Sequence, residues 1–230
     1  MSTLLELRTR ARRLADAVGN NFFSDGEVDD YINTGLGELH DLLVSKFEDY
    51  YVSSATHTLT SGTSTYSLAT IGITDFYKIL GVDINQGSDT IRVPRFSFPE
   101  RNMFSSNTSI YTDKGYTHYR YNLNGTNLEF IPIPNAAETI KVWYVPAYTK
   151  LTTDGATTDG SLAFNWEEYA VLSAAIKMRA KEETASKTLE RELERMTMRI
   201  EEASRNRDAG ESMGIIDETV GVLPGYWLLS

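Results

Sequence analysis

The sequence predicts an α+β fold: a four-helix bundle formed by N- and C-terminal helix pairs, a mostly antiparallel β insertion, and an extended C-terminal tail. Three observations lead to this prediction. Apolar residues recur in steps of three and four near both ends of the chain, which is the helical period. The region between them is rich in Thr, Ser and Tyr and is divided by turn signals. After Arg207, the last twenty-three residues contain no Lys or Arg and end on an apolar run.

Composition excludes several classes of protein. The chain has 230 residues, of which 41% are hydrophobic and 23% are charged, as is ordinary for a globular protein. It contains no cysteine, so disulfides and thiolate zinc sites are excluded and a reducing compartment is favoured. No apolar run has the length of a membrane span, and the start lacks the order of a secretory signal. The net charge of −10 argues against a protein that grips nucleic acid, although the first helix is basic.

The N-terminal region predicts a helical hairpin. Its first helix presents Leu4, Leu7, Ala11, Leu14 and Val18 on one face before a break at 19–21. The second helix begins at a capping box, in which the oxygen of Ser24 accepts from the amide of Glu27 and Glu27 reaches back. Its core positions are expected at Val28, Ile32, Leu36, Leu39, Leu43 and Phe47, and its two glycines, Gly35 and Gly37, are expected to permit close helix packing.

The middle region, 53–163, predicts a compact and mostly antiparallel β insertion. Two β-prone runs flank the turn signal Ser61-Gly62, and Asn124-Gly125 is a strong hairpin signal. Pro99 is well placed to start a short helical turn, and 152–161 has the composition of a loop. The expected strands are 56–59, 65–68, 77–84, 90–93, 117–121, 127–131 and 139–145.

The C-terminal helix pair, 164–207, is expected to complete a bundle with 1–52. A second capping box is predicted from Asn165 to Glu168, and one side of the helix that follows carries Trp166, Tyr169, Leu172, Ile176 and Ala180. The final helix presents Leu189, Leu193, Met196, Ile200 and Ala203 in a short coiled-coil-like seam. Its basic face is formed by Lys187, Arg191, Arg195 and Arg199, all four residues apart.

Two interpretations of this basic face remain open. A charged helix face of this kind is commonly solvated, and a contact with protein or nucleic acid is the alternative.

No catalytic or metal-binding motif is found. The three histidines, His40, His57 and His118, are scattered and do not have metal-ligand spacing. We therefore expect no catalytic residue, no metal and no cofactor. The alternative is a metal-dependent hydrolase, for which Glu27 and Asp30 would need a further converging carboxylate.

The β insertion contains tyrosines that are candidates for an interface. Tyr111, Tyr116, Tyr119 and Tyr121 lie close together in the sequence, with Arg120 among them. Aromatic residues next to basic residues can stack single-stranded bases. Because tyrosine is also enriched at protein interfaces and the chain is acidic, we expect a contact with neighbouring subunits or tail proteins instead.

Six segments, taken in order, resemble the head-to-tail adaptor (connector) proteins of tailed bacteriophages. They are LLELRTR (4–10), FSDGEVDDYIN (23–33), FPERN (98–102), LEFIPIP (128–134), VWYVP (142–146) and WEEY (166–169). The resemblance covers most of 4–207. It implies a non-enzymatic virion protein of the neck between capsid and tail, assembled in the host cytoplasm. It also implies a twelve-subunit ring beneath the portal protein, a channel through which DNA passes without specific binding, and a face that receives tail or nozzle proteins.

The C-terminal arm, 208–230, lies outside the matched segments, so its role is argued from physics. Ordering its backbone costs roughly 1–2 kcal/mol per residue. Burying each large apolar side chain returns about 1.5–3 kcal/mol. The two sums nearly balance, so we expect the arm to be ordered only where a partner adds contacts. The expected portal-binding residues are Ile215, Ile216, Tyr226, Trp227, Leu228 and Leu229.

Two alternatives concern the arm and the function. The arm could instead fold onto its own domain. The protein could also be another neck or tail-completion protein, such as a stopper or a tail-tube component.

Overall fold

The computed structural model describes 1–19, 22–48, 50–102, 112–113, 116–160, 162 and 165–205. These residues form a mixed α+β fold with five α-helices and antiparallel sheets, which confirms the α+β part of the prediction. The predicted tail, 208–230, lies outside the described residues.

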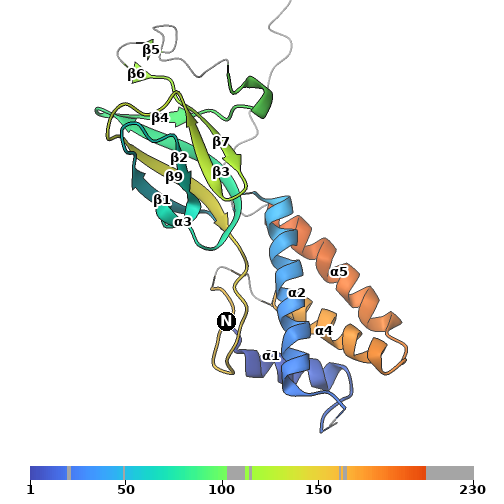
Figure 1. Cartoon of the computed structure of the whole chain (residues 1–230). Helices are drawn as coiled ribbons and strands as arrows, with labels where there is room; N and C mark the ends of the chain where they lie inside the picture. The colour runs from blue at the N-terminus through green and yellow to red at the C-terminus, as the bar shows by residue number, and fades with distance from the viewer. Residues whose placement is uncertain are drawn as a thin grey trace, which may run out of the picture.

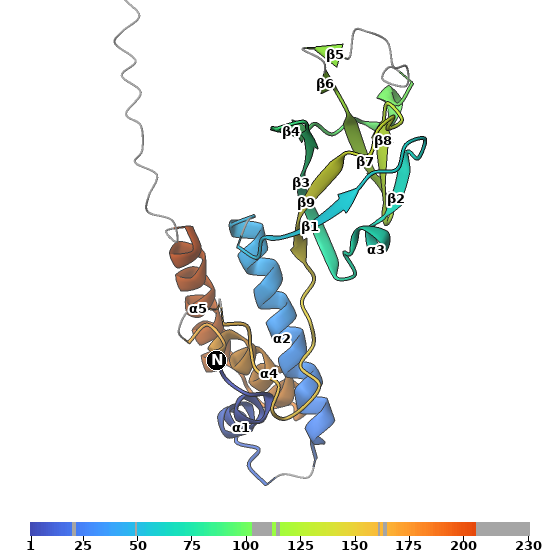
Figure 2. The same ribbon diagram turned by 90° about the vertical axis from the view of Figure 1, so that its left-hand side faces the viewer.

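Four helices pack together at one end of the described chain and form what we call the helical unit (Figures 1 and 2). The central helix is α4, which contacts the other three. Helices α2 and α5 run side by side, and α1 crosses at the end away from the sheets (Figures 1 and 2). The four helices are α1 (Leu4–Leu14), α2 (Asp25–Lys46), α4 (Glu168–Lys181) and α5 (Lys187–Arg205).

The central position of α4 changes which of its residues are buried. The predicted single face included Ala180, which is exposed, and Ile176, which is only half-buried. Because helices cover α4 from several sides, small residues pack where larger ones would not fit. Its buried residues are Ala170, Val171, Leu172, Ser173, Ala174, Ala175 and Met178.

Close packing between α2 and α4 depends on Gly35. A Cβ atom at Gly35 would lie 2.9 Å from the Cα atom of Ala170 and 3.2 Å from the Cβ atom of Ser173. The predicted role of Gly35 is therefore confirmed. A Cβ atom at Gly37 would meet only the ring of Tyr148, at 3.7 Å, which is ordinary contact, so Gly37 does not have that role.

The starts of α1 and α2 are capped by side chains, and two details of the capping differ from the prediction. The hydroxyl of Ser24 accepts from the amide of Glu27 as predicted. The carboxylate of Glu27 does not reach back, because it accepts from the hydroxyl of Tyr31 and from the ammonium of Lys181. A capping box that we did not predict begins α1, where the amide of Thr3 donates to the carboxylate of Glu6 and the Thr3 hydroxyl accepts in return.

Two other predicted boundaries were wrong. Helix α1 ends at Leu14, and Asp16 has a positive φ of 59°, so Val18 lies outside the helix and is exposed. The predicted capping box at Asn165 does not form, because Asn165 itself has a positive φ of 68° and Glu167 occupies the cap position. The left-handed conformation of Asp16 turns the chain away from α1 before Val18, and that of Asn165 turns it before α4 begins.

The strands form a second body of structure, which we call the β unit, joined to the helical unit through the end of α2 and the segment after β9 (Figure 1). Its largest sheet has the order β1-β9-β3-β4, a second sheet has the order β2-β8-β7, and β5 pairs with β6. The strands are β1 (Ser53–Thr58), β2 (Thr65–Ser67), β3 (Phe76–Gln86), β4 (Asp89–Val93), β5 (Thr112–Asp113), β6 (Tyr116–Thr117), β7 (Arg120–Asn124), β8 (Asn127–Ile131) and β9 (Thr139–Pro146). Two short helices, α3 (Leu68–Ile71) and the 3₁₀ turn η1 (Phe98–Glu100), complete it.

Strand pairing confirms the predicted hairpin and shows that the other turn does not form one. Strands β7 and β8 pair across the Asn124-Gly125 turn, where Gly125 has a φ of 60°. The strands on either side of Ser61-Gly62 do not pair with each other: β1 pairs with β9, and β2 pairs with β8. The residues that make β9 a central strand are Ile140 and Val142, which are fully buried in the core between the sheets.

Candidate assembly surfaces

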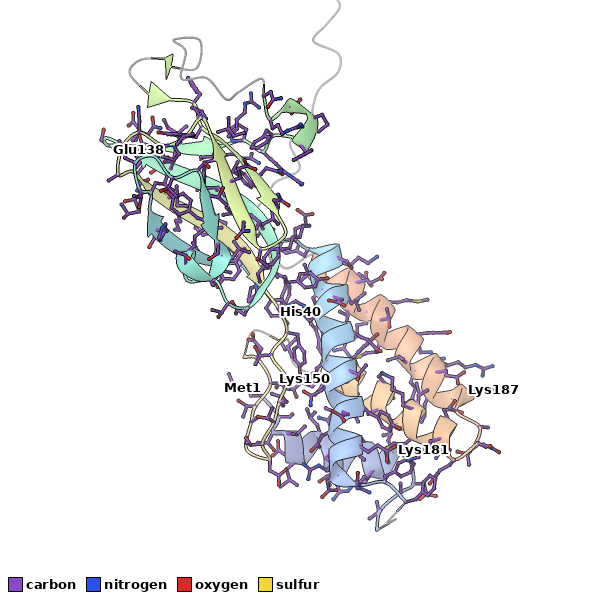
Figure 3. The ribbon with its side chains drawn as sticks, viewed as in Figure 1. Met1, His40, Glu138, Lys150, Lys181 and Lys187 are labelled. Carbon is purple, nitrogen blue, oxygen red and sulfur yellow. The ribbon has the colours of Figure 1, made fainter. Side chains whose placement is uncertain are left out.

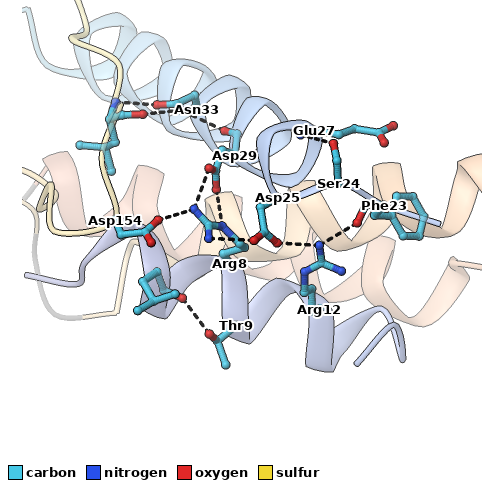
Figure 4. A network of polar contacts seen from close by, with 12 residues as sticks. Arg8, Thr9, Arg12, Phe23, Ser24, Asp25, Glu27, Asp29, Asn33 and Asp154 are labelled. Carbon is cyan, nitrogen blue, oxygen red and sulfur yellow. Dashed lines mark hydrogen bonds and ion pairs between the residues drawn. The ribbon is translucent and has the colours of Figure 1, made fainter. Parts of the chain in front are cut away.

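Arg8 anchors α1 to the rest of the helical unit (Figure 4). Its guanidinium donates to Asp29 of α2 through two nitrogens, at 2.7 and 2.8 Å, and to Asp154 of the loop before α4 at 2.6 Å. The Arg8 side chain is buried, which lowers the pKa of its guanidinium, but the hydrogen bonds to Asp29 have the larger effect and raise the net pKa above its ordinary value. One buried cation therefore joins three segments that are distant in the sequence.

Most of the positive charge of the first helix is used inside the chain. Arg10 forms an ion pair with Glu168 of α4. Arg12 donates to the carbonyl oxygen of Phe23 and to Asp25, both at 2.8 Å. With Arg8 buried as well, α1 presents only Arg13 as an exposed arginine. The basic character of this helix in the sequence therefore reflects internal ion pairs rather than a surface for polyanions.

Asn33 of α2 holds the segment after β9 against the helix through hydrogen bonds. Its side-chain oxygen accepts from the hydroxyl of Tyr148 and from the amide of Leu151, both at 2.8 Å. Its side-chain nitrogen donates to the carbonyl oxygens of Asp29 and Leu151. Burial raises the pKa of Tyr148 to about 12, so this phenol stays protonated and keeps donating.

Glu167 ties the start of the chain to α4. It accepts hydrogen bonds from the amide and the hydroxyl of Ser2 and from the hydroxyl of Thr158. Burial raises the pKa of Glu167, but these hydrogen bonds outweigh burial and the net pKa is lowered. The contact is therefore strongest when Glu167 is ionised.

This contact predicts a pH dependence. Because the pKa of Glu167 is lower in the folded than in the unfolded chain, its stabilisation is present above the unfolded value of about 4.3 and is lost as the pH falls through the folded value. Replacing Glu167 with Gln is expected to reduce the free energy of unfolding by about 1–2 kcal/mol at neutral pH. Urea unfolding at several pH values should show the difference from the wild type shrinking below pH ~4. A difference that is constant with pH would contradict this assignment.

His40 lies where the helical unit meets the β unit (Figure 3). Its ring Nε2 lies 3.1 Å from the carbonyl oxygen of Pro146 at the end of β9. The ring stacks on Tyr51 at 4.9 Å and meets Tyr77 of β3 edge-on at 5.3 Å. A cavity of about 430 Å³ opens beside it, lined by residues of α2, by Tyr51 and Asp75, and by 146–151, 156–159 and Leu162. His40 is therefore a structural residue at the junction.

The outer face of α5 is exposed. Arg191, Arg195 and Arg199 are all exposed, while Met196 and Ile200 turn toward the other helices and are buried. The predicted seam is therefore oriented as expected, except that Ala203 at its end is exposed. Met198, also on the outer side, is 69% exposed.

The structure brings two of the four predicted interface tyrosines into the core of the β unit. Tyr119 is 2% exposed and Tyr121 is 8% exposed, and both belong to the core between the sheets. An exposed contact surface therefore does not include their rings, because the hydrophobic face of β7 points inward. Tyr116 lies in β6, and Tyr111 lies outside the described residues.

Other large apolar side chains are exposed on the β unit, and none of them was predicted as an interface residue. They are Phe98 and Ile133, each next to a proline, and Tyr77. The guanidinium of Arg101 lies over the Phe98 ring at 4.3 Å. The prolines beside Phe98 and Ile133 were the available signal, since proline favours turns at the surface. The six predicted portal-binding residues all lie outside the described residues.

The described residues form neither a metal-binding cluster nor a helix that could cross a membrane. No group of three or more acidic, histidine or cysteine side chains there could hold a metal ion. Among the same residues, none of the helices combines the length and apolar character needed to cross a bilayer.

Comparison with known proteins assigns the family. No curated protein matches the chain. The family model described as SU10 adaptor protein matches 2–214, a range that includes every helix of the helical unit and every strand of the β unit. The chain therefore belongs to the SU10 adaptor protein family, a family of phage head-to-tail adaptors.

Proposed function

We propose that this protein is a structural virion component that joins the head of a phage to its tail. It forms a ring, of twelve subunits by the earlier resemblance, beneath the portal protein. The ring extends the DNA channel and provides the docking platform for tail or nozzle proteins in the virion neck. The observation that carries the proposal is the family match, which spans 2–214 and so includes both units of the fold.

The side chains that could have suggested catalysis support a structural role. Glu27, one of the two candidate metal ligands, accepts from Lys181 and Tyr31, and these hydrogen bonds lower its pKa. A cation bound beside a carboxylate competes with a metal for the same oxygen atoms. Arg8 and Glu167 likewise make internal contacts that hold segments together.

In this proposal each part of the chain has its own task. Residues 1–52 and 164–207 form a four-helix bundle that is the rigid body of the subunit. The β-rich domain, 53–163, meets neighbouring subunits or tail proteins, with Tyr111 and Tyr116 as contact residues. The extended arm, 208–230, binds the portal through its apolar residues, Ile215, Ile216, Tyr226, Trp227, Leu228 and Leu229. DNA passes the net negative chain without the cation contacts that tight binding requires.

Deleting 212–230 tests the arm. The truncated protein is expected to lose binding to portal rings while its thermal unfolding midpoint stays unchanged, because the backbone entropy lost on ordering the arm nearly balances the gain from burying its apolar side chains. Binding is measured as the number of adaptor copies per portal ring by native mass spectrometry. Trp227→Ala should weaken binding strongly, and Thr219→Ala in the same arm is the matched control.

The outcomes of this binding experiment distinguish an adaptor from another neck or tail-completion protein. Unchanged portal binding by the truncated protein would exclude the arm as the portal contact. Binding to tail proteins but not to the portal would favour another neck or tail-completion protein.

A further inference from the structure

The cavity beside His40 is lined by apolar side chains from two sides. Leu36 and Leu39 come from α2, and Leu151 comes from the segment after β9. Its volume of about 430 Å³ falls within the range of about 300–1,000 Å³ in which pockets hold ligands. A site of this kind favours a large apolar or aromatic group that carries few polar atoms.

The walls of this cavity are already held in place. Tyr148 lines it and donates its hydroxyl to Asn33 at 2.8 Å. Tyr51 also lines it, and its ring stacks on the ring of His40. A group that enters the cavity therefore does not have to order these side chains, which lowers the cost of binding.

The polar groups of the cavity suit the aromatic end of the C-terminal arm. Asp75 and Asp159 line the cavity and are exposed, so their carboxylates offer hydrogen-bond acceptors at its rim. A buried tryptophan needs an acceptor for its indole N–H, and a buried tyrosine needs one for its hydroxyl. Tyr226 and Trp227 bring both donors on adjacent residues. The exposed Lys150, which also lines the cavity, is a cation of the kind that the face of an indole ring attracts.

The arm leaves the helical unit within reach of this cavity. Lys46 at the end of α2 pairs with Glu201 near the end of α5, at 3.1 Å. His40 lies six residues before Lys46 on α2, which is about 9 Å along the helix axis. Trp227 follows Arg205 by 22 residues, and a flexible chain of that length spans about 25 Å. The tether therefore holds Trp227 at a local concentration in the millimolar range around the cavity of its own subunit.

We propose that the C-terminal arm docks into this cavity of its own subunit before assembly, with Tyr226 and Trp227 as the anchor. The inference rests on the proposed function only where it names the portal as the competing partner. Docking is marginal, because ordering the arm costs about as much free energy as burying its apolar side chains returns. A portal that offers the same residues more contacts therefore displaces the arm from the cavity.

Cysteine trapping tests this contact, because the native chain contains no cysteine. Ser230→Cys in the arm is combined with Thr149→Cys, at an exposed position that lines the cavity. The matched control combines Ser230→Cys with Thr153→Cys, at an exposed position of the same segment that does not line the cavity. Mass spectrometry follows the intramolecular disulfide during oxidation. We expect it to form about tenfold faster with position 149 than with position 153. Equal rates would overturn the proposal.

A further substitution tests the anchor. Trp227→Ala, added to the Thr149→Cys pair, is expected to slow trapping to the rate of the control. Thr219→Ala, in the same arm, should leave the rate unchanged. Trapping that stays fast without the indole ring would show that Trp227 does not anchor the arm.

Mixing experiments distinguish the arm of the same subunit from that of a second copy. Proteins that carry only Thr149→Cys and only Ser230→Cys are mixed and oxidised. We expect their mixed dimer to form no faster than the one made with Thr153→Cys. A faster mixed dimer would show that the cavity receives the arm of another copy, and docking within the subunit would be wrong.

The two proposals can fail separately. Portal rings added before oxidation are expected to slow trapping within the subunit, and trapping unaffected by a bound portal would overturn the competition. Equal trapping rates with intact portal binding would reject the cavity contact and leave the adaptor function standing. Fast trapping at position 149 without any portal binding would do the reverse.

Discussion

Replacing Gly35 with alanine is expected to lower the free energy of unfolding by about 2–3 kcal/mol, through overpacking between two helices. The added methyl group would lie 2.9 Å from the Cα atom and 3.1 Å from the carbonyl oxygen of Ala170. These are backbone atoms, so no side-chain rotation can make room, and α2 must move away from α4. The intrinsic helix preference of alanine offsets at most about 1 kcal/mol of this loss.

The matched control is Gly37→Ala, two residues further along the same helix. Its methyl group would touch only the ring of Tyr148 at 3.7 Å, an ordinary contact. We therefore expect the control to be neutral or to stabilise the protein by up to about 1 kcal/mol. Urea unfolding followed by circular dichroism measures both variants. Equal effects of the two substitutions would contradict the packing role of Gly35.

The second large effect is expected for Arg8→Met, which should cost about 3–5 kcal/mol of unfolding free energy. Methionine keeps most of the side-chain volume but removes the cation that joins α1, α2 and the loop before α4. Asp29 would then lose both of its hydrogen bonds from Arg8 in a partly buried position. Its companions, Asp25 and Asp154, are more exposed and should tolerate the loss.

Two controls separate the buried ion pair from a general loss of positive charge. Arg13→Met removes an exposed arginine of the same helix and should change stability by less than about 0.5 kcal/mol. Asp29→Asn, added to Arg8→Met, removes the stranded carboxylate and should recover part of the loss. The unfolding free energies of the wild type, Arg8→Met, Asp29→Asn and the double variant form a double-mutant cycle. A coupling energy near zero would show that Arg8 and Asp29 do not act together.

The local elements of this fold were largely predictable. Helical periodicity placed the four long helices, Asn124-Gly125 located its hairpin, and Ser24 marked the start of α2. Gly35 was predicted to permit close packing, because glycine within a helix is destabilising unless the space is needed. Each of these features depends on residues that are neighbours in the chain.

Pairings over long distances could not be predicted in the same way. The strand after α2 pairs with β9, more than eighty residues later, although a nearer strand has similar composition. Register and partner are decided by which face is buried in the assembled core, not by local preference. Tyr119 and Tyr121 illustrate the consequence: their sequence environment suggested an interface, and the sheets instead enclose them.

The same difference between local and long-range effects applies to the charged residues of the candidate surfaces. The exposure of Arg191, Arg195 and Arg199 followed from the phase of the apolar seam on their own helix. The burial of Arg8 did not follow from anything near it, since its partners come from α2 and from a loop about 150 residues away. Glu27 was predicted to cap its own helix, and the approach of Lys181 from α4 redirected it.

The sequence by itself determined the α+β fold class, the buried face of α2 and the resemblance to phage adaptors that the family match confirmed. Periodicity and capping are local, and the physics that produces them acts within a few residues. Only the tertiary structure decided which strands are neighbours, that α4 is the central helix, and which charged side chains form ion pairs within the chain. Those outcomes depend on the distance between segments remote in sequence, because Coulomb energy and burial are set by the surroundings of a group rather than by its position along the chain.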